Sequence, residues 1–318
     1  MRVAVGLIII CVAAGAAAFA TGGGAWVGDT WGSRMVKLSP NGSIVRTVGP
    51  FVYPYGVGID PNDGSVWFTV NADTVVKMIN EGQELFRRSY STEQISVNPG
   101  DGGCWIRVYN PPGAVRLSKE GTETAKVPLG RASWVSSAAG DGGCWATDAT
   151  AGVVLRISTA GSVISSFGGF ASPAACAAHA KDDSVSVVES ANVVRLSTAG
   201  SVVFRTPLAS GFCVDVNHKD DSTWVGAGSA LYKLDAAGSI VNTIPAGGMV
   251  NVVTVNSGDG SAWVAIYDLN SVAKYTAAGS LVFRLPGFNK VKGMAAEQAP
   301  AYEHIAPASM GKVKALYR

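Results

Sequence analysis

The amino-acid sequence predicts an all-β fold, a seven-bladed β-propeller of four-stranded blades whose first blade is completed by the C-terminal strand. The main observation is a pattern that recurs every 38 to 41 residues and contains a tryptophan, then a basic residue and then a glycine. A period near 40 residues with strand-type sequence is typical of propeller blades. The three columns are Trp26, Trp67, Trp105, Trp145, Ser186, Trp224 and Trp263; Lys37, Lys77, Arg116, Arg156, Arg195, Lys233 and Lys274; and Gly42, Gly82, Gly121, Gly161, Gly200, Gly238 and Gly279.

The second copy of the repeat shows how one blade is built. Residues 54–60 form a short strand of small and β-branched residues, and residues 61–64 contain the Asp-Gly pair that favours a tight hairpin turn. Further strands are expected over 65–69, 74–79 and 83–87. Four short antiparallel strands without helical periodicity describe a propeller blade.

The count of strands predicts how the ring closes. Innermost strands are expected to begin near Pro54, Glu93, Ser133, Ala174, Phe212, Asn251 and Lys292. The first tryptophan strand, at 25–27, has no innermost strand before it, and the last innermost strand, at 291–296, has no tryptophan strand after it. The last strand should therefore join the first blade, which removes the exposed edges of an open ring.

The repeated columns are interpreted as structural. The tryptophans are expected to pack blade on blade, and each basic residue to bury its stem and leave its charged end solvated or in a salt bridge. Asp29, Asp148 and Glu189 share one slot, three positions after the tryptophan column, and should organise the turn that follows. Cys104 and Cys144 also share a slot and should not face each other.

Cys176 and Cys213 lie on neighbouring innermost strands, where contact is conceivable, but buried small apolar residues are the preferred interpretation.

The two ends of the chain lie outside the repeat, which covers residues 23–297. Residues 1–20 have a basic start and an apolar run from Val3 to Ala20, which predicts a signal peptide or, alternatively, an uncleaved N-terminal anchor. The protein is therefore expected to be secreted, periplasmic or at the cell surface, with membrane contact only through an uncleaved segment. Residues 298–318 form a C-terminal tail that either docks on the ring or a neighbouring subunit or remains free.

Several strings resemble NHL-type repeats, among them residues 25–29, 35–42, 54–60 and 63–69. The chain is also similar to the virginiamycin B (streptogramin) lyases, seven-bladed propellers with an Asp-Gly-x-x-Trp-Phe-Thr motif per blade. That resemblance implies a histidine base, acidic partners and a bound magnesium ion on one face. Of the histidines here, His179 and His218 fall by register on the opposite face and His304 lies beyond the last blade, so none maps onto the base.

A further resemblance, to gluconolactonase-like propellers, implies a divalent metal near the axis held by acidic and Asn side chains. Asp215 is the one carboxylate well inside an innermost strand. A single carboxylate supplies too few oxygen ligands to hold a divalent ion.

A ligand is expected at the mouth of the central channel, which is framed by the loops that enter the innermost strands and leave the second strands. Aromatic and polar side chains gather on these loops, as ligand sites require. Trp31, Tyr53 and Phe288 are further aromatic residues there. The candidate ligand-binding residues are Tyr55, Glu93, Gln94, Arg107, Tyr109, Trp134, Asp148, Glu189, Phe212, Asn251, Tyr267 and Asp268.

The repeat pattern and the candidate residues lead to two functional hypotheses. The first is an exported, non-enzymatic scaffold that binds a protein or a glycan or associates with itself, with no cofactor. The net charge is only +2, and the basic residues are spread one per repeat rather than clustered. This distribution argues against nucleic acid as a partner. The alternative is a metal-dependent lyase or hydrolase with a divalent ion among Glu93, Asp148 and Glu189. No nucleophile elbow, phosphate loop or zinc-spaced Cys/His set is present.

Overall fold

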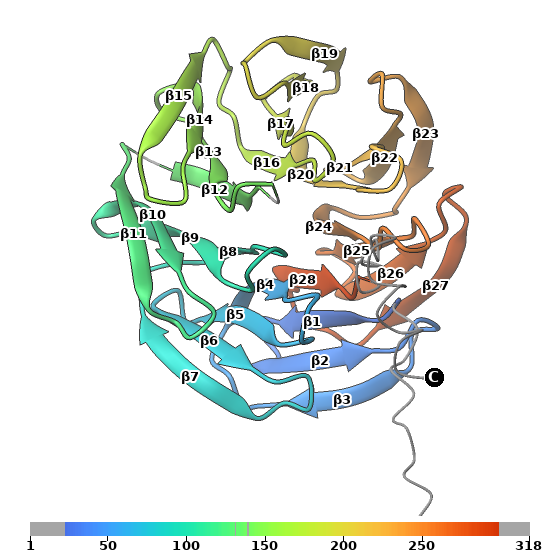
Figure 1. Cartoon of the computed structure of the whole chain (residues 1–318). Helices are drawn as coiled ribbons and strands as arrows, with labels where there is room; N and C mark the ends of the chain where they lie inside the picture. Colours follow the sequence, from blue (N-terminus) through green and yellow to red (C-terminus); the bar gives the residue numbers. More distant parts are fainter. Residues whose placement is uncertain (1–22, 131, 139, 299–318) are drawn as a thin grey trace, which may run out of the picture.

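The computed structural model describes residues 23–130, 132–138 and 140–298, which form seven four-stranded antiparallel sheets around a central axis (Figure 1). No helix occurs in these three ranges. The predicted all-β, seven-bladed propeller is therefore confirmed. The predicted signal segment and the tail from residue 299 onward lie outside the described residues, and no helix of the described part is long and apolar enough to cross a membrane.

The two strands nearest the axis carry the channel and the tryptophan column. The innermost strands are β4 (Pro54–Ile59), β8 (Gln94–Val97), β12 (Ala132–Ser137), β16 (Ala175–Ala178), β20 (Gly211–Val216), β24 (Val250–Val255) and β28 (Gly293–Ala296). The second strands are β1 (Ala25–Asp29), β5 (Val66–Val70), β9 (Cys104–Tyr109), β13 (Cys144–Asp148), β17 (Val185–Val188), β21 (Thr223–Ala227) and β25 (Ala262–Ile266). Each innermost strand begins within one residue of its predicted start.

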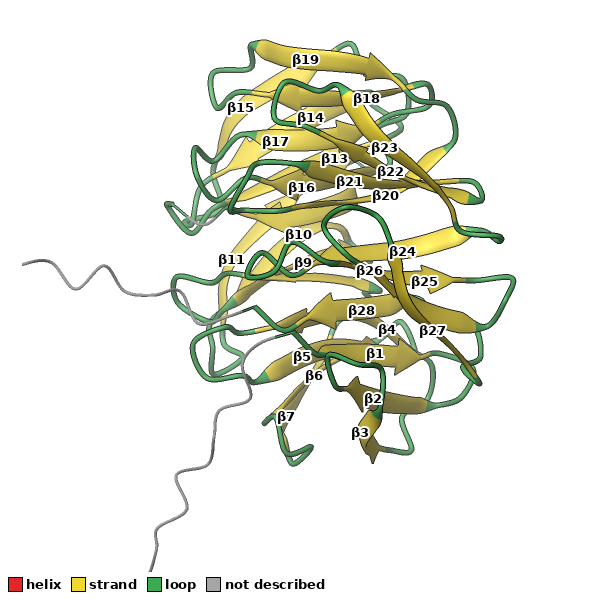
Figure 2. Cartoon of the chain, turned by 90° about the vertical axis from the view of Figure 1, so that its right-hand side faces the viewer, coloured by secondary structure: helices red, strands yellow, loops and turns green. Residues whose placement is uncertain are grey.

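The two outer strands complete each blade, and Figure 2 shows them from the side of the ring. The third strands are β2 (Arg34–Leu38), β6 (Thr74–Met78), β10 (Pro112–Leu117), β14 (Val153–Ile157), β18 (Asn192–Leu196), β22 (Ala230–Leu234) and β26 (Ser271–Tyr275). The outermost strands are β3 (Ile44–Val48), β7 (Glu84–Ser89), β11 (Glu123–Pro128), β15 (Val163–Gly168), β19 (Val202–Pro207), β23 (Ile240–Pro245) and β27 (Leu281–Pro286).

The ring closes as the strand count predicts. In the first blade, β28 pairs antiparallel with β1, and Ala296 lies opposite Ala25. Gln298, the last described residue, donates from its side-chain amide to the carbonyl of Val255 at 2.6 Å. The two ends of the ring are thus held by ladder hydrogen bonds and by a side-chain bond into the seventh blade.

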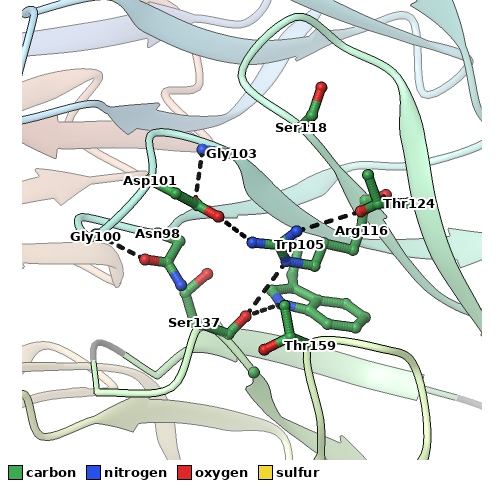
Figure 3. A network of polar contacts seen from close by, with 12 residues as sticks. Asn98, Gly100, Asp101, Gly103, Trp105, Arg116, Ser118, Thr124, Ser137 and Thr159 are labelled. Carbon is green, nitrogen blue, oxygen red and sulfur yellow. Dashed lines mark hydrogen bonds and ion pairs between the residues drawn. The ribbon is translucent and has the colours of Figure 1, made fainter.

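The tryptophan and basic columns meet within six of the seven blades. The basic residue lies directly opposite the tryptophan on the neighbouring strand, as in the pairs Trp105–Arg116 and Trp263–Lys274. All six tryptophans of the column are fully buried. In the third blade the Trp105 indole N–H donates to the carbonyl of Gly142 in the next blade at 3.1 Å, and Arg116 forms an ion pair with Asp101 (Figure 3). The structural interpretation of both columns is confirmed.

The fifth blade replaces its tryptophan with a small polar cluster. His179, directly after β16, is fully buried, and its Nε2 lies 2.9 Å from the hydroxyl of Ser186, the residue in the tryptophan slot. The Ser186 hydroxyl also lies 3.1 Å from that of Thr223 on the next blade. The cluster therefore takes over the blade-to-blade contact that tryptophan makes elsewhere.

All four cysteines of the described residues are free and buried, so no disulfide joins Cys176 to Cys213.

Candidate functional site

The centre of the ring holds a cavity of about 360 Å³ lined by the innermost strands. Its lining comes from all seven innermost strands in roughly equal shares, with Arg107 added from β9. Seven of the twelve predicted ligand residues line this channel: Tyr55, Glu93, Gln94, Arg107, Trp134, Phe212 and Asn251. The loops that frame the mouth therefore do bring most of the candidate residues together.

Many polar side chains of the channel wall are used to join neighbouring blades. The Gln94 amide donates to the carbonyl of Val135 at 2.8 Å and accepts the N–H of the same residue at 3.1 Å. The Asn251 amide donates to the carbonyl of Val291 at 3.0 Å. Since their polar atoms already satisfy the edges of adjacent strands, Gln94 and Asn251 contribute mainly to the wall of the channel.

A charged cluster lies on one side of the mouth. The Tyr109 hydroxyl donates to Glu93 at 2.7 Å, and the Arg107 guanidinium lies 3.8 Å from the same carboxylate and 4.2 Å from the Tyr109 ring centre. Arg107 also donates to the carbonyl of Ser133 in the next blade at 2.9 Å. Tyr109 does not line the cavity itself, but it fixes the orientation of Glu93, which does.

Beside the channel mouth lies a second hollow of about 340 Å³, lined by Trp31, Tyr53, Tyr55, Asn289 and Lys292. We call these five residues the aromatic shelf. Trp31 and Tyr53 are 57% and 43% exposed, and the Lys292 ammonium lies 5.1 Å from the Tyr55 ring centre. Tyr55 and Lys292 also line the channel, so the shelf and the channel are continuous. Burial and the charge of Glu93 raise the pKa of the Tyr55 hydroxyl.

The shelf is held in place by backbone contacts between the two ends of the ring. The N–H of Trp31 donates to the carbonyl of Asn289 at 2.9 Å, and the N–H of Asn289 donates to the carboxylate of Asp29 at 2.6 Å. Tyr53 has a φ of 45°, a left-handed conformation that is uncommon for an aromatic residue. Such a strained backbone persists only where its surroundings fix it, and it concentrates at binding sites.

The remaining predicted residues lie outside both hollows and are engaged by their own loops. Asp148 accepts the N–H groups of Thr150 and Ala151, each at 2.9 Å. Glu189 accepts the N–H of Ala171 at 2.9 Å and forms an ion pair with Arg205. Glu189 also accepts from the side-chain amide of Asn192, three residues further on, at 2.8 Å. The expectation that this acidic slot organises the turn after it is confirmed for Asp148 and Glu189.

Tyr267 and Asp268 have similar roles on the seventh blade. The Lys290 ammonium lies 4.1 Å from the Tyr267 ring centre, and Asp268 accepts the N–H of Met249 at 3.1 Å. Neither residue reaches the channel or the shelf. The sequence-based set did not include Trp31, Tyr53, Asn289 or Lys292. Trp31 and Tyr53 could be predicted from the sequence as aromatic residues of the mouth loops. Nothing in the sequence marks Asn289 as a site residue.

Within the described ranges, no group of three or more His, Cys, Asp or Glu side chains is arranged to hold a metal ion. Asp215 lies on the channel wall, where it accepts the N–H of Val255 in the next blade at 2.8 Å. Burial raises the pKa of this carboxyl. His179 follows the end of β16 and His218 lies two residues after β20, which places both at the end of the channel opposite the mouth, as predicted.

Comparison with known proteins adds the following. No known family model matches the chain, and no curated protein does. Among solved structures, virginiamycin B lyase from Staphylococcus aureus matches with a TM-score of 0.62 and 17% identity, over 74% of this chain and 84% of the lyase. The chain has the lyase fold. At this identity the likeness is one of fold alone, and it confirms the lyase-like propeller expected from the sequence.

Other solved propellers match the same ring. A functionally unknown protein from Desulfotomaculum acetoxidans matches with a TM-score of 0.75 and 14% identity, over 86% of this chain and 98% of that protein. The WD40 repeats of RRP9 match with a TM-score of 0.68 and 10% identity, over 76% and 83%. A lyase-like ring therefore does not by itself decide between an enzyme and a binding scaffold.

Proposed function

We propose that this chain is an exported, non-enzymatic propeller that binds a glycan across the aromatic shelf and the channel mouth. The observation that carries the proposal is the shelf, in which two exposed aromatic rings, an amide and an ammonium group share one hollow. The apolar segment 1–20 supports export to the periplasm, the cell surface or the medium.

The chemistry of the shelf fits a sugar. The C–H face of a pyranose ring packs on aromatic rings such as those of Trp31 and Tyr53, which supply apolar area at little entropic cost. Hydroxyl groups of the same sugar can accept from the Lys292 ammonium and exchange hydrogen bonds with the Asn289 amide. Because no carboxylate lines the shelf, a glycan with acidic groups is favoured over a basic one.

The geometry of the ring also suits the binding of the end of a glycan chain. The shelf lies beside the mouth, and the channel behind it has a volume of about 360 Å³, which is in the range of small-ligand sites. One sugar unit on the shelf therefore leaves room for a second unit above Glu93 and Arg107.

The test is isothermal titration of the purified chain with neutral and uronic-acid-containing oligosaccharides. We expect Trp31→Ala to weaken binding by about fivefold, since one aromatic contact contributes about 1 kcal/mol. Leu85→Ala is the matched control, because Leu85 is as exposed as Trp31 but lies on the outermost strand β7. The proposal is wrong if no oligosaccharide binds, or if Trp31→Ala and Leu85→Ala bind equally well.

The likeness to virginiamycin B lyase favours a second candidate, a metal-dependent lyase or hydrolase acting at the channel mouth. Glu93 is the acidic residue that lines the channel near Arg107. Metal analysis and thermal melting with magnesium, calcium and EDTA test this candidate. One ion per chain that is lost in Glu93→Gln would support it, whereas unchanged melting in all three conditions would leave the binding scaffold.

A further inference from the structure

The outer circumference of the ring carries a repeated apolar feature that the channel site does not use. On five blades, the outermost strand begins with two aliphatic residues whose side chains are 41% to 57% exposed. We call these pairs the apolar edges. They are Ile44–Val45, Val163–Ile164, Val202–Val203, Ile240–Val241 and Leu281–Val282.

The apolar edges occupy one continuous arc of the ring. They lie on β15, β19, β23, β27 and β3, which follow one another around the circumference in Figure 1. The two outermost strands outside this arc are β7 and β11. There the same positions hold Glu84, which forms an ion pair with Arg87 at 2.7 Å, and Glu123, which accepts the Tyr90 hydroxyl at 2.8 Å. The fold thus tolerates charge at this position, and five blades nevertheless expose aliphatic residues.

The backbone at these edges is open on one side. Each outermost strand pairs only with the third strand of its own blade in the described part of the chain. Every blade also has a register shift at this point, which leaves residues such as Val45 and Val241 without a partner across the ladder. A bulge of this kind kinks an edge strand and opposes continuous sheet extension. A partner would therefore contact the aliphatic side chains rather than add a strand to the whole edge.

We propose that the edges of the fourth and sixth blades are self-association surfaces, through which copies of this chain pack side by side, rim against rim. This proposal is independent of the ligand at the channel mouth. Exposed contiguous apolar surface on a protein marks an interaction site.

Charge and symmetry point to a second copy of the chain as the occupant. The strands β15 and β23 contain no charged residue, so two like edges approach without repulsion. A contact between identical patches is self-complementary about a two-fold axis. Because each chain carries two such edges, weak single contacts combine by multivalency into a side-by-side assembly. A flat lipid surface fits less well, since the arc curves around the ring and turns most of its edges away from any one plane.

The first experiment measures association directly. Sedimentation velocity over a wide concentration range is run on the purified chain, on Ile164→Glu combined with Val241→Glu, and on Thr124→Glu. The last variant is the matched control, because Thr124 occupies the same register on the third blade, beside Glu123. All three proteins carry the same termini, so any contribution from residues 1–22 or 299–318 cancels. We expect the double variant to raise the apparent dissociation constant at least tenfold and the control to match the parent.

The second experiment does not depend on added charge. Val241→Cys and Thr124→Cys are oxidised at equal concentration; the four cysteines of the ring are buried and do not interfere. Faster disulfide-linked dimer formation for Val241→Cys, by fivefold or more, supports the proposal. Equal rates for the two variants, or a parent chain that stays monomeric at the highest concentration, overturn it. Flotation of a monomeric parent with phosphatidylcholine vesicles would likewise overturn it and assign the edges to lipid.

Discussion

Lowering the pH should destabilise this propeller through one buried histidine. His179 is fully buried beneath the fifth blade. Burial, assisted by the nearby Arg195 guanidinium, lowers its pKa to about 4, against the opposing influence of Asp221 and Asp182. In the unfolded chain the same group has a pKa of about 6.5. Protons therefore bind the unfolded chain more readily than the folded one between these two values.

The sign and size of the effect follow from proton linkage. A histidine whose folded-state pKa is lowered leaves stability intact above pH 6.5 and removes it as the pH falls toward 4. For a shift from about 6.5 to about 4, the loss in free energy of unfolding is about 1 kcal/mol at pH 6, about 2 kcal/mol at pH 5 and about 3 kcal/mol at pH 4. Domains of this kind have a total stability of about 5–15 kcal/mol, so the loss is readily measurable.

The chain itself suggests the matched variant. The equivalent position in three other blades is an asparagine, Asn98, Asn217 or Asn256, and the Asn98 and Asn256 amides donate to the next blade. His179→Asn should therefore fold and lack the titrating group. Urea unfolding followed by tryptophan fluorescence at pH 7.5, 6, 5 and 4 compares it with the parent. We expect the parent to lose about 2 kcal/mol more than the variant between pH 7.5 and pH 5. Parallel losses, or a His179 pKa near 6.5 by NMR, would refute the reasoning.

Two further predictions concern closure and the cysteines. A chain ended at Lys290 loses β28 and the buried side chains of Val291, Met294 and Ala296. The loss lowers the free energy of unfolding by about 5 kcal/mol, so this chain should melt without a cooperative transition. A chain ended at Gln298 keeps β28 and should melt as the parent does. A melting curve for the shorter chain that matches the parent would contradict the closure. Burial raises the pKa of Cys213 to about 12 and that of Cys176 still further, so thiol reagents at pH 8 should modify none of Cys104, Cys144, Cys176 and Cys213 until the ring is unfolded in denaturant. Mass spectrometry before and after unfolding checks this, and rapid modification of any of the four in the folded protein would count against the packing described.

The repeat made the blade architecture predictable from the sequence. Each blade has four short strands and a basic residue of the repeat within about 40 residues, and six of the seven blades also have the tryptophan. All innermost strands were therefore located to within one residue, and the closure by β28 followed from counting. The same locality explains why Asp148 and Glu189 could be predicted as turn organisers, since each accepts a hydrogen bond from a residue two or three positions further on.

The candidate site was predictable only in part. Seven of the twelve proposed residues line the channel because register along an innermost strand decides which side chains face the axis. Tyr109, Tyr267 and Asp268 lie on the loops at the channel mouth, but their side chains contact neighbouring groups instead of lining the cavity. The path of each loop decides this, and the sequence does not reveal it. The aromatic shelf was missed as a unit, because it joins Trp31 near the start of the ring to Asn289 and Lys292 near its end.

The sequence by itself determined the number of blades, the order of their strands and the way the ring closes. The reason is that each repeat specifies its own strands locally, and counting these strands gives the closure. The tertiary structure decided what the repeats cannot encode one at a time. It brought Trp31 beside Asn289, placed His179 against Ser186 where the tryptophan is missing, and turned the aliphatic pairs of five blades outward. The physical reason is that such contacts form between strands and loops distant in the chain, whose meeting is fixed only when all seven blades pack around one axis.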